Sequence, residues 1–328
     1  MGSIISAEDL VVVYSDGTRA VDGISFGIEE GGFFGFLGPN GAGKSTTIRV
    51  LTTLLRKTAG KVSVASFDLD RSPGEIRKAI GVVSQETVVD VDLTGRENLR
   101  LQGRLQQMHG RVLEERIEEL LRMVELLDVG DKEAGRYSGG MKKRLDLASA
   151  LVHEPKLLFL DEPTTGLDPQ SRSAIWEHLE KLNKESKVTM FLTTQYLEEA
   201  DRLCRKLSII DHGKVIASGS PSDLKAALGG DTIAISLTDD GLRASAKEIL
   251  KAIPGVTNAM DSDGGIVANA TSAGQVIAEI ITTLDRNGIR PSSISISSPT
   301  LDDVFLRQTG RRIRSEELSR KETEPFLS

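Results

Sequence analysis

Residues 33–47, FFGFLGPNGAGKSTT, have the residue types and spacing of a phosphate-binding loop. An apolar run leads into Gly38-x-x-x-x-Gly43-Lys44-Ser45, and a helical pattern follows it. The glycines permit a tight turn in which successive backbone N–H groups point inward, and the helix N-terminus adds partial positive charge. We expect Lys44 to reach the terminal phosphates of a nucleoside triphosphate and Ser45 to bind Mg²⁺; a glycine-rich turn with an incidental lysine is the alternative. The expected phosphate-binding residues are Gly38, Pro39, Asn40, Gly41, Ala42, Gly43, Lys44, Ser45 and Thr46.

An acidic pair follows a second buried strand pattern. Residues 157–160 form the apolar run LLFL, and Asp161 and Glu162 come directly after it. An aspartate in this position can hold the hydration shell of Mg²⁺, and the next carboxylate can accept a proton from the water that attacks the γ-phosphate. The alternative is two acids that cap a strand. Together with the phosphate loop, the pattern favours Asp161 as a metal ligand, with Glu162 and Lys44 as catalytic residues.

The elements that position these residues alternate between strand and helix, which is typical of an α/β domain. Seven strands are predicted in this region, in LVVVY, ISFGI, FFGFL, IGVVS, KLLFLD, VTMFLT and LSIID. Near residue 220 the stretch SGSPSDLKAALGGD indicates the edge of a linker. We therefore expect a nucleotide-binding domain over residues 1–224.

Residues 230–300 show a different order of elements. Strands are predicted in TIAISL, GVTNAM, GGIVANA and SSISIS, and helices over residues 243–252 and 273–286. The resulting order βαββαβ is that of a small ferredoxin-like α+β domain.

The last region, residues 301–328, is predicted to be a short helix and a frayed, charged tail. Thr300 should cap the helix and Gly310 should end it. One helix face, which we expect to pack against another element, holds Leu301, Val304, Phe305 and Gln308.

Composition and charge exclude several classes of protein. The net charge of −7 argues against a dedicated nucleic-acid binder, for which a basic face is expected. The single cysteine, Cys204, cannot form an intrachain disulfide and fits a reducing compartment. No apolar run approaches the ~18 residues that a membrane span needs. A cytosolic protein is the expectation.

The segment Ser138-Gly139-Gly140 also precedes a helical pattern, so a second set of N–H groups lies at a helix N-terminus. A second anion nest is useful if it closes over the nucleotide of a neighbouring copy. At YSGGMKKRL, LLFLDEP and TTGLDP, together with GPNGAGKST, the chain resembles an ATP-binding cassette (ABC) ATPase over about residues 4–224. The resemblance implies a P-loop cassette with a mixed sheet and a helical subdomain. It also implies a homodimer that holds two ATPs, with the Ser138 segment contacting the partner's γ-phosphate.

The resemblance assigns further roles. Gln85 matches the hinge glutamine that touches Mg²⁺ and the attacking water; a solvated loop glutamine is the alternative. Asp168 matches the loop that crosses the dimer interface and can also cap a helix, with Pro169 at its first position. Tyr14 stands where the family stacks an aromatic ring on adenine; packing at a sheet edge is the alternative. The segment DLTGRENLRL, which has a capping-box pattern, lies in the region that meets the membrane subunit.

Gln195 follows Thr193 and Thr194 where most members of the family have a histidine that reaches the γ-phosphate. A glutamine donates and accepts hydrogen bonds but carries no charge, so nucleotide sensing is retained and only a pH-sensitive switch is in doubt. The alternative is a polar residue that opens a helix, with Glu198 and Glu199 in its first turn.

TTQYLEEADRL, YSGGMKKRLDLA and SPTLDDVFLRQTGR resemble a narrower group, the daunorubicin/doxorubicin-resistance type of ABC export ATPase. This resemblance implies an ATPase that energises a separate permease for efflux of a hydrophobic or antibiotic-like compound. Two ATPase and two permease chains are expected, with the ATPase peripheral on the cytoplasmic face of the membrane. The rival hypothesis is a soluble ABC ATPase that acts as a regulatory switch. The absence of a second cassette, a long coiled-coil insertion and a basic face argues against the rival.

Overall fold

A computed structural model describes residues 3–237, 239–262 and 265–310 of the chain. The chain divides between Ser218 and Gly219 into two compact units, a few residues before the boundary expected at residue 224. The expected tail after residue 310 lies outside the described residues. Each unit has a sheet and a core of its own.

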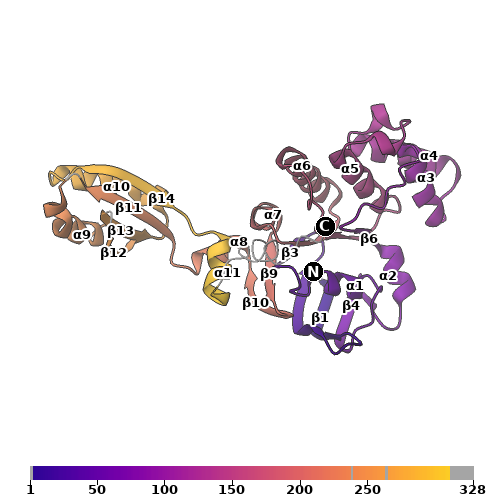
Figure 1. The fold of residues 1–328 in the computed structure, drawn as a ribbon, viewed down its shortest axis with the longest axis horizontal. Coiled ribbons are helices and arrows are strands. Elements are labelled where there is room, and N and C mark those ends of the chain that lie inside the picture. The colour runs from indigo at the N-terminus through magenta and orange to yellow at the C-terminus, as the bar shows by residue number, and fades with distance from the viewer. Residues whose placement is uncertain (1–2, 238, 263–264, 311–328) are drawn as a thin grey trace, which may run out of the picture. The chain divides into compact units, whose positions relative to one another are not determined.

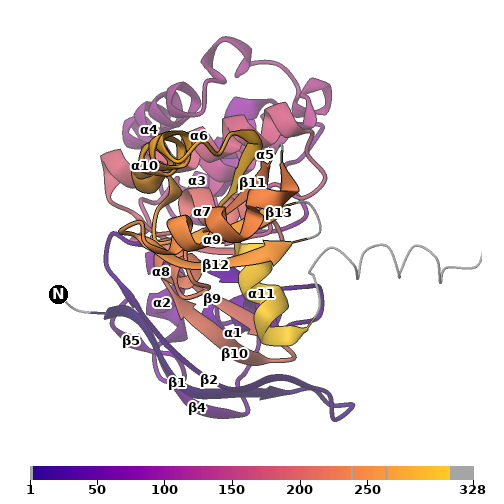
Figure 2. The same cartoon turned by 90° about the vertical axis from the view of Figure 1, so that its left-hand side faces the viewer.

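The first unit contains two sheets, which are drawn in Figure 1 and, turned by 90°, in Figure 2. One sheet is antiparallel, with the order β2 (Arg19–Glu29), β1 (Ser3–Val13), β4 (Ala59–Val64) and β5 (Phe67–Asp68). The other sheet has the order β10 (Lys214–Gly219), β9 (Lys206–Asp211), β3 (Phe33–Leu37), β8 (Thr189–Thr194), β7 (Leu157–Asp161) and β6 (Ile80–Val83). From β9 to β6 the neighbouring strands are parallel, so their carboxyl ends share one edge.

Seven helices belong to the described part of this unit. They are α1 (Lys44–Leu51), α2 (Pro73–Ala79), α3 (Gly95–Leu105), α4 (Gly110–Met123), α5 (Gly139–Ala150), α6 (Pro169–Ser186) and α7 (Leu197–Leu203). Helices α3, α4 and α5 contact one another and form the expected helical subdomain (Figure 1). The expected capping box opens α3, because Thr94 and Glu97 exchange hydrogen bonds at its N-terminus.

The core of the first unit contains residues of both sheets. Strands β3 and β8 are buried along their whole length, which explains their near-continuous apolar sequences. The Phe26 ring, from β2, packs against Phe36 of β3 with ring centroids 4.9 Å apart. Phe36 in turn packs against Phe191 of β8 at 5.1 Å. These contacts fix the strands whose ends carry the candidate site.

All seven strands predicted for this unit are present. Strands β4, β5 and β10 were not predicted.

In the second unit, the stretch interpreted as the edge of a linker contains a short helix, α8 (Pro221–Ala226), which Ser220 caps. The Ser220 hydroxyl accepts a hydrogen bond from the backbone N–H of Asp223 at 3.0 Å.

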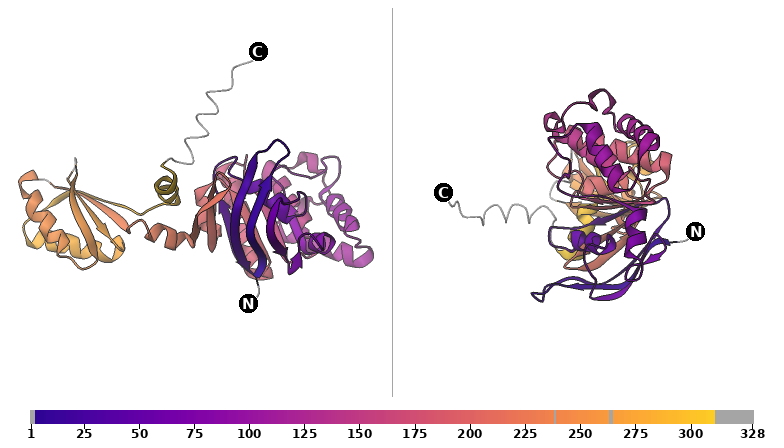
Figure 3. Two further views of the ribbon diagram at one scale, coloured as in Figure 1. Left: turned by 90° about the horizontal axis from the view of Figure 1, so that it is seen from below. Right: turned by 90° about the vertical axis from the view of Figure 1, so that its right-hand side faces the viewer.

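The second unit confirms the predicted βαββαβ order. Its elements are β11 (Asp231–Leu237), α9 (Arg243–Lys251), β12 (Val256–Ser262), β13 (Gly265–Ala270), α10 (Ala273–Arg286) and β14 (Pro291–Ser297). The strands pair in the order β12-β13-β11-β14, all antiparallel, as in a ferredoxin-like domain. Both helices pack against this sheet (Figure 3, left).

The last helix, α11 (Leu301–Thr309), packs against α8. Thr300 caps it and the left-handed Gly310 ends it, as predicted. Three of the four residues expected on its packed face are buried: Leu301, Val304 and Phe305. Gln308 is exposed, so this part of the expected face does not pack.

Candidate nucleotide-binding site

The phosphate loop spans the gap between the end of β3 and the first residue of α1, at the carboxyl edge of the parallel strands. Gly43 has a φ of +104°, and a Cβ atom there would lie 2.4 Å from the carbonyl oxygen of Ala20. At Gly38 a Cβ atom would lie 2.3 Å from the carbonyl oxygen of Ile210. Only glycine fits these two positions, so the loop keeps the tight turn that an anion nest needs.

The Lys44 side chain is buried within this loop. Its ammonium donates to the carbonyl oxygens of Gly38, at 2.8 Å, and Pro39, at 3.0 Å. It also lies 3.1 Å from the Glu162 carboxylate. The charge predicted to bind phosphate is therefore held at the loop beside the predicted base.

Asp161, at the end of β7, meets Ser45 at the start of α1. The Ser45 hydroxyl donates to Asp161 Oδ1 at 3.0 Å, and the Thr193 hydroxyl donates to the same oxygen at 2.6 Å. Hydroxyl and carboxylate oxygens are ligands that Mg²⁺ prefers. The pair predicted as metal ligands is thus brought together in a geometry that fits this ion.

Glu162 follows Asp161 in a left-handed conformation, with a φ of 46°. Its backbone N–H donates to the carbonyl oxygen of Thr193 at 3.0 Å, and the Thr165 hydroxyl lies 3.3 Å from its Oε2. These contacts hold the carboxylate toward Lys44. A positive φ is uncommon for a residue with a side chain and is often stored at functional sites.

Tyr14 lies beside the loop at the end of β1. Its hydroxyl is 3.0 Å from the hydroxyl of Thr46, a residue of the predicted phosphate-binding set. The ring is only half-buried, so part of its surface is accessible beside the phosphate loop. This position suits an aromatic ring next to a bound base.

Gln85 and Gln195 lie at the same sheet edge. Val83 of β6 pairs with Leu160 of β7, so Gln85 reaches the level of the acidic pair, and its side chain is exposed. Gln195 follows Thr194, whose carbonyl oxygen accepts a hydrogen bond from the Gly38 N–H at 3.3 Å. Gln195 is therefore adjacent to the first residue of the phosphate loop.

The helix after Gln195 starts later than expected. Helix α7 begins at Leu197, and Tyr196 is its N-cap. The Tyr196 N–H donates to the Thr194 hydroxyl at 2.9 Å, which turns the chain before the helix. Gln195 thus does not open the helix, and this observation weakens the alternative that it is only a helix-opening residue.

The Ser138 segment begins α5, and Asp168 begins α6. Ser138 accepts a hydrogen bond from the Met141 N–H at 3.3 Å, and Asp168 accepts one from the Ser171 N–H at 2.9 Å. The hydrogen bonds from Ser171 lower the pKa of Asp168. A Cβ atom at Gly140 would lie 3.0 Å from the Ser171 hydroxyl oxygen, so the two helix N-termini are adjacent.

Ser138, Gly139 and Asp168 are exposed. Within the described residues 3–237, no hydrogen bond joins the Ser138 segment to the phosphate loop of the same chain. Both helix starts are therefore open to a second molecule. This arrangement is what a contact across a dimer interface requires.

Three hydrogen bonds at or near this site were not predicted. Thr193 orients Asp161, and Thr164 and Trp176 both donate to the buried Glu199 of α7 at 2.9 Å. The pKa of Glu199 is raised, because the effect of burial is larger than the opposing effect of these hydrogen bonds. The two threonines after the apolar run of β8 were the available signal for Thr193. The contacts of Glu199 join segments far apart in sequence and leave no local pattern.

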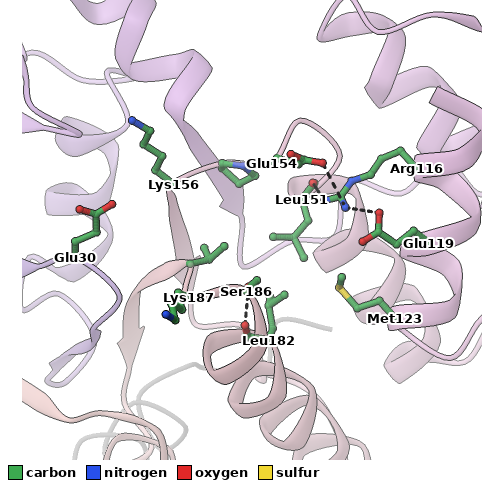
Figure 4. Close-up of a pocket in the computed structure, with 12 residues that line it drawn as sticks. Glu30, Arg116, Glu119, Met123, Leu151, Glu154, Lys156, Leu182, Ser186 and Lys187 are labelled. Atoms are coloured by element: carbon green, nitrogen blue, oxygen red, sulfur yellow. Dashed lines mark hydrogen bonds and ion pairs between the residues drawn. The ribbon is translucent and has the colours of Figure 1, made fainter. Parts of the chain in front are cut away.

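A separate cavity of about 500 Å³ lies away from this site (Figure 4). Lys156 and Val188, which line it, immediately precede β7 and β8, so it lies at the amino edge of the sheet. Arg116 forms ion pairs there with Glu119 and Glu154, as the dashed lines in Figure 4 show. The cavity contains none of the predicted site residues.

Two family models match the chain. The ABC transporter model matches residues 21–165, and the model of the ATP-binding protein DrrA1-3-like, C-terminal domain, matches residues 219–309. Together with the site geometry, they define the chain as an ABC ATPase.

Full-length relatives refine this class. The chain is 42% identical over 320 residues to the daunorubicin resistance ATP-binding protein DrrA2 of Streptomyces coeruleorubidus, over 96% of this chain and 98% of that protein. It is 44% identical over 306 residues to the daunorubicin/doxorubicin resistance ATP-binding protein DrrA of Streptomyces peucetius, over 93% of this chain and 92% of that protein. It is 35% identical over 313 residues to the linearmycin resistance ATP-binding protein LnrL of Bacillus subtilis strain 168, over 95% and 100%. The chain belongs to the family of ABC transporter ATP-binding proteins with a DrrA-like C-terminal domain.

Solved structures agree with this assignment. The cbiO1 protein of Clostridium perfringens, part of the ABC transporter complex cbiONQ, matches with a TM-score of 0.64 and 30% identity, over 68% of this chain and 91% of that one. The ATP-binding cassette MJ0796, a dimer bound to ADP and Pi, matches with a TM-score of 0.60 and 27% identity, over 66% and 98%. ABC ATPase cassettes act as dimers with membrane permease partners, and this chain is an ATPase of that class.

Proposed function

We propose that the chain hydrolyses ATP to ADP and phosphate at the Lys44 loop and thereby powers a separate membrane permease. The observation that carries this proposal is the convergence of Lys44, Ser45, Asp161 and Glu162, joined by contacts of 3.0–3.1 Å at one sheet edge. A triphosphate, a hydrated Mg²⁺ ion and a base to activate water need this set of groups.

Binding begins with the loop itself. Backbone N–H groups of the loop and of the first turn of α1 surround the phosphates, and Lys44 exchanges its contacts with two loop carbonyls and Glu162 for contacts with the γ-phosphate. The half-buried ring of Tyr14 stacks on adenine at the entrance of the loop.

Hydrolysis needs a positioned water and a base. Ser45 and Asp161 would hold Mg²⁺, with Gln85 as a further ligand from the same sheet edge. When bound, Mg²⁺ neutralises charge that develops on the phosphate oxygens. Glu162 accepts the proton of the attacking water, and Gln195 orients the water and the γ-phosphate through hydrogen bonds.

A second copy completes the site. The exposed N-terminus of α5, with Ser138, Gly139 and Gly140, contacts the γ-phosphate of the partner, and Asp168 crosses the interface. Because each chain supplies one phosphate loop and one such helix start, a head-to-tail homodimer holds two ATPs.

The permease contact is supported by four exposed apolar residues that follow Gln85 in the chain. Val88, Val91, Leu101 and Leu105, in the Gln85 loop and α3, have exposed fractions of 61%, 48%, 43% and 68%. Exposed apolar surface is common where a protein meets a partner, and we propose that these side chains contact the permease. No helix of the described residues is long and apolar enough to cross a membrane.

The assembly that follows is two ATPase chains on two permease chains, with the ATPase on the cytoplasmic face of the membrane. The relatives named for resistance to daunorubicin, doxorubicin and linearmycin favour efflux of a hydrophobic, antibiotic-like compound.

Reconstitution tests the proposal. The chain is co-expressed with its permease, and the complex is placed in proteoliposomes with daunorubicin as a probe. We expect Mg²⁺-dependent ATP hydrolysis that the permease stimulates, with ATP-dependent movement of the drug. A complex that forms and hydrolyses no ATP would contradict the ATPase assignment. Hydrolysis without stimulation by any membrane partner would favour the regulatory alternative.

A further inference from the structure

Helix α5 carries an ion pair in its buried face. Lys143 and Asp146 are three residues apart and lie on the same side of the helix, with Nζ 3.5 Å from Oδ2. Their side chains are only 6% and 1% exposed. The mechanism above uses neither residue, although both are charged and buried in the subdomain that contains the Ser138 segment.

The pair contacts the loop that contains Gln85. Lys143 donates to the carbonyl oxygen of Ser84 at 2.6 Å and lies 3.5 Å from that of Gln85. Asp146 reaches this loop through Lys143, because its Oδ2 pairs with the ammonium while its Oδ1 is buried without a hydrogen-bond partner among the described residues. Lys143, which is paired with Asp146, therefore holds the first two residues of the segment 84–88 against α5.

Burial of such a pair needs a reason. Two charges taken out of water often contribute less stability than well-packed apolar side chains of similar volume. Here Lys143 has further partners in the backbone of the Gln85 loop, the carbonyl oxygens of Ser84 and Gln85. The hydrogen bonds to the loop, rather than the attraction between the two charges, distinguish this pair from an apolar contact.

The position of the pair connects three features of the proposed function. Lys143 lies one helical turn after Gly139, so α5 joins it rigidly to the segment that faces the partner's nucleotide. Gln85 is the proposed ligand of Mg²⁺. Val88 is one of the exposed apolar residues proposed to contact the permease.

We propose that Lys143 and Asp146 are positioning residues that lock the Gln85 loop onto α5. Displacement of the loop by the permease then moves Gln85 and the Ser138 segment as one body. This inference rests on the proposed function, because it assigns the pair a role in the same hydrolysis reaction. The residues touch neither ATP nor Mg²⁺, so they act through Gln85.

The test replaces the pair as a whole. Lys143→Met alone leaves a buried, unpaired carboxylate and can unfold the chain, so the principal variant is Lys143→Met with Asp146→Leu. We expect it to fold and to keep the KM for ATP within about twofold, since the phosphate loop is intact. Its kcat in the permease complex should fall ~10–100-fold, because Gln85 is no longer held in place.

A second variant and a control separate positioning from stability. Lys143→Arg keeps a donor for the Ser84 carbonyl and should therefore keep most of the wild-type kcat. The control, Glu75→Leu with Lys78→Met, removes an exposed pair of the same spacing on α2 and should change neither parameter. A wild-type kcat in the double variant would overturn the proposal. A loss of kcat in Lys143→Arg as large as that in the double variant would also overturn it.

Hydrogen exchange tests the lock without any enzymatic readout. Amides of residues 84–88 should exchange faster in the principal variant than in the wild-type complex, while those of α5 stay protected. Unchanged exchange in residues 84–88 would overturn the lock even if ATP hydrolysis is normal. This comparison does not depend on hydrolysis, so failure of the ATPase assignment is seen separately, as an absence of ATP hydrolysis by the wild-type complex.

Discussion

The ammonium of Lys44 lies 3.1 Å from the carboxylate of Glu162, so the candidate phosphate-binding charge and the candidate base form a buried ion pair. Their side chains are 4% and 6% exposed. A buried charge needs a partner of opposite charge, and Lys44 and Glu162 are partners of one another. An incoming γ-phosphate must compete with Glu162 for Lys44. We therefore expect ATP binding to release Glu162 toward the attacking water.

The first prediction concerns Glu162→Gln. The amide no longer attracts Lys44, so ATP should bind at least as tightly as to the wild type. Hydrolysis should slow ~10²–10⁴-fold, the scale for loss of a positioned base. Equilibrium binding of a fluorescent ATP analogue and single-turnover hydrolysis measure the two effects, and an ATP-bound dimer should accumulate on a sizing column.

The exposed Glu185→Gln is the matched control for the loss of one negative charge, and it should leave both parameters unchanged. Wild-type turnover in Glu162→Gln would assign the base to another residue.

The second prediction concerns Lys44→Ala. The variant loses the charge that faces the terminal phosphates and should bind ATP at least ~100-fold more weakly. It also leaves the Glu162 carboxylate buried and unpaired, which destabilises a protein by roughly 3–5 kcal/mol. Thermal unfolding should therefore start at a lower temperature.

Adding Glu162→Gln to Lys44→Ala separates these effects. The double variant should regain much of the lost thermal stability without regaining ATP affinity. If ATP affinity returned together with stability, weak binding in the single variant would reflect unfolding rather than loss of a phosphate contact.

Sequence patterns predicted the parts of this site that depend on local chemistry. The phosphate loop, the acids after β7 and the caps at Thr94, Asp168 and Thr300 all rest on residues a few positions apart. The order of elements in the second unit followed from the same kind of signal. A strand such as β4 was missed because AGKVSV is short and contains glycine, lysine and serine, whereas pairing with β1 and β5 and the burial of Val62 and Val64 stabilise it.

The Lys143–Asp146 pair shows why other features escape sequence analysis. In MKKRLDL, charged residues outnumber apolar ones, so the pattern resembles an exposed helix face. Lys143 is nevertheless buried, because its partner carbonyls come from Ser84 and Gln85, about sixty positions earlier in the chain. Contacts of this kind depend on how the subdomain packs, and no local periodicity reports them.

The third prediction uses the titration of Asp146. Burial raises its pKa to about 6 from 3.8, against the opposing effect of Lys143. Between these values the native chain binds more protons than the unfolded chain, so this carboxyl's contribution to stability decreases as pH rises. Asp146→Asn lacks the effect. The free energy of unfolding of the wild type, minus that of the variant, should fall by roughly 2–3 kcal/mol from pH 4 to pH 7.

Chemical denaturation of both proteins across this pH range measures the difference, in which the carboxyl groups that they share cancel. A difference that stays constant, or rises with pH, would show that the Asp146 carboxyl is not protonated more readily in the native chain.

The fourth prediction concerns a chain that ends after Gly219. The hydrophobic clusters of the two units share no residue, so the first unit should fold alone and bind ATP. We expect transport or dimer stability to suffer more than nucleotide affinity. Circular dichroism and ATP binding of the shortened chain check this result, and loss of folding would show that the two units depend on a shared core.

The last prediction concerns Gln195, the residue beside the phosphate loop. If it acts through neutral hydrogen bonds, its contribution should vary little between pH 6 and 8, because an amide does not titrate there. Gln195→Ala should keep most of the ATP affinity and lose hydrolysis, since the water loses one orienting partner while the Lys44 loop is unchanged.

Gln195→His tests how a titratable charge at this position affects the pH dependence of hydrolysis. The imidazole can form the same hydrogen bonds but titrates near ~6.5, so the variant should keep activity and acquire a pH dependence in that region. Steady-state hydrolysis by the permease complex is measured against pH for all three proteins, and each rate is divided by that of the wild type at the same pH, which removes titrations that they share. The ratio for alanine should be low and flat, and that for histidine should bend near the imidazole pKa. An alanine variant that hydrolyses ATP at the wild-type rate would reduce Gln195 to a polar residue in the turn before α7.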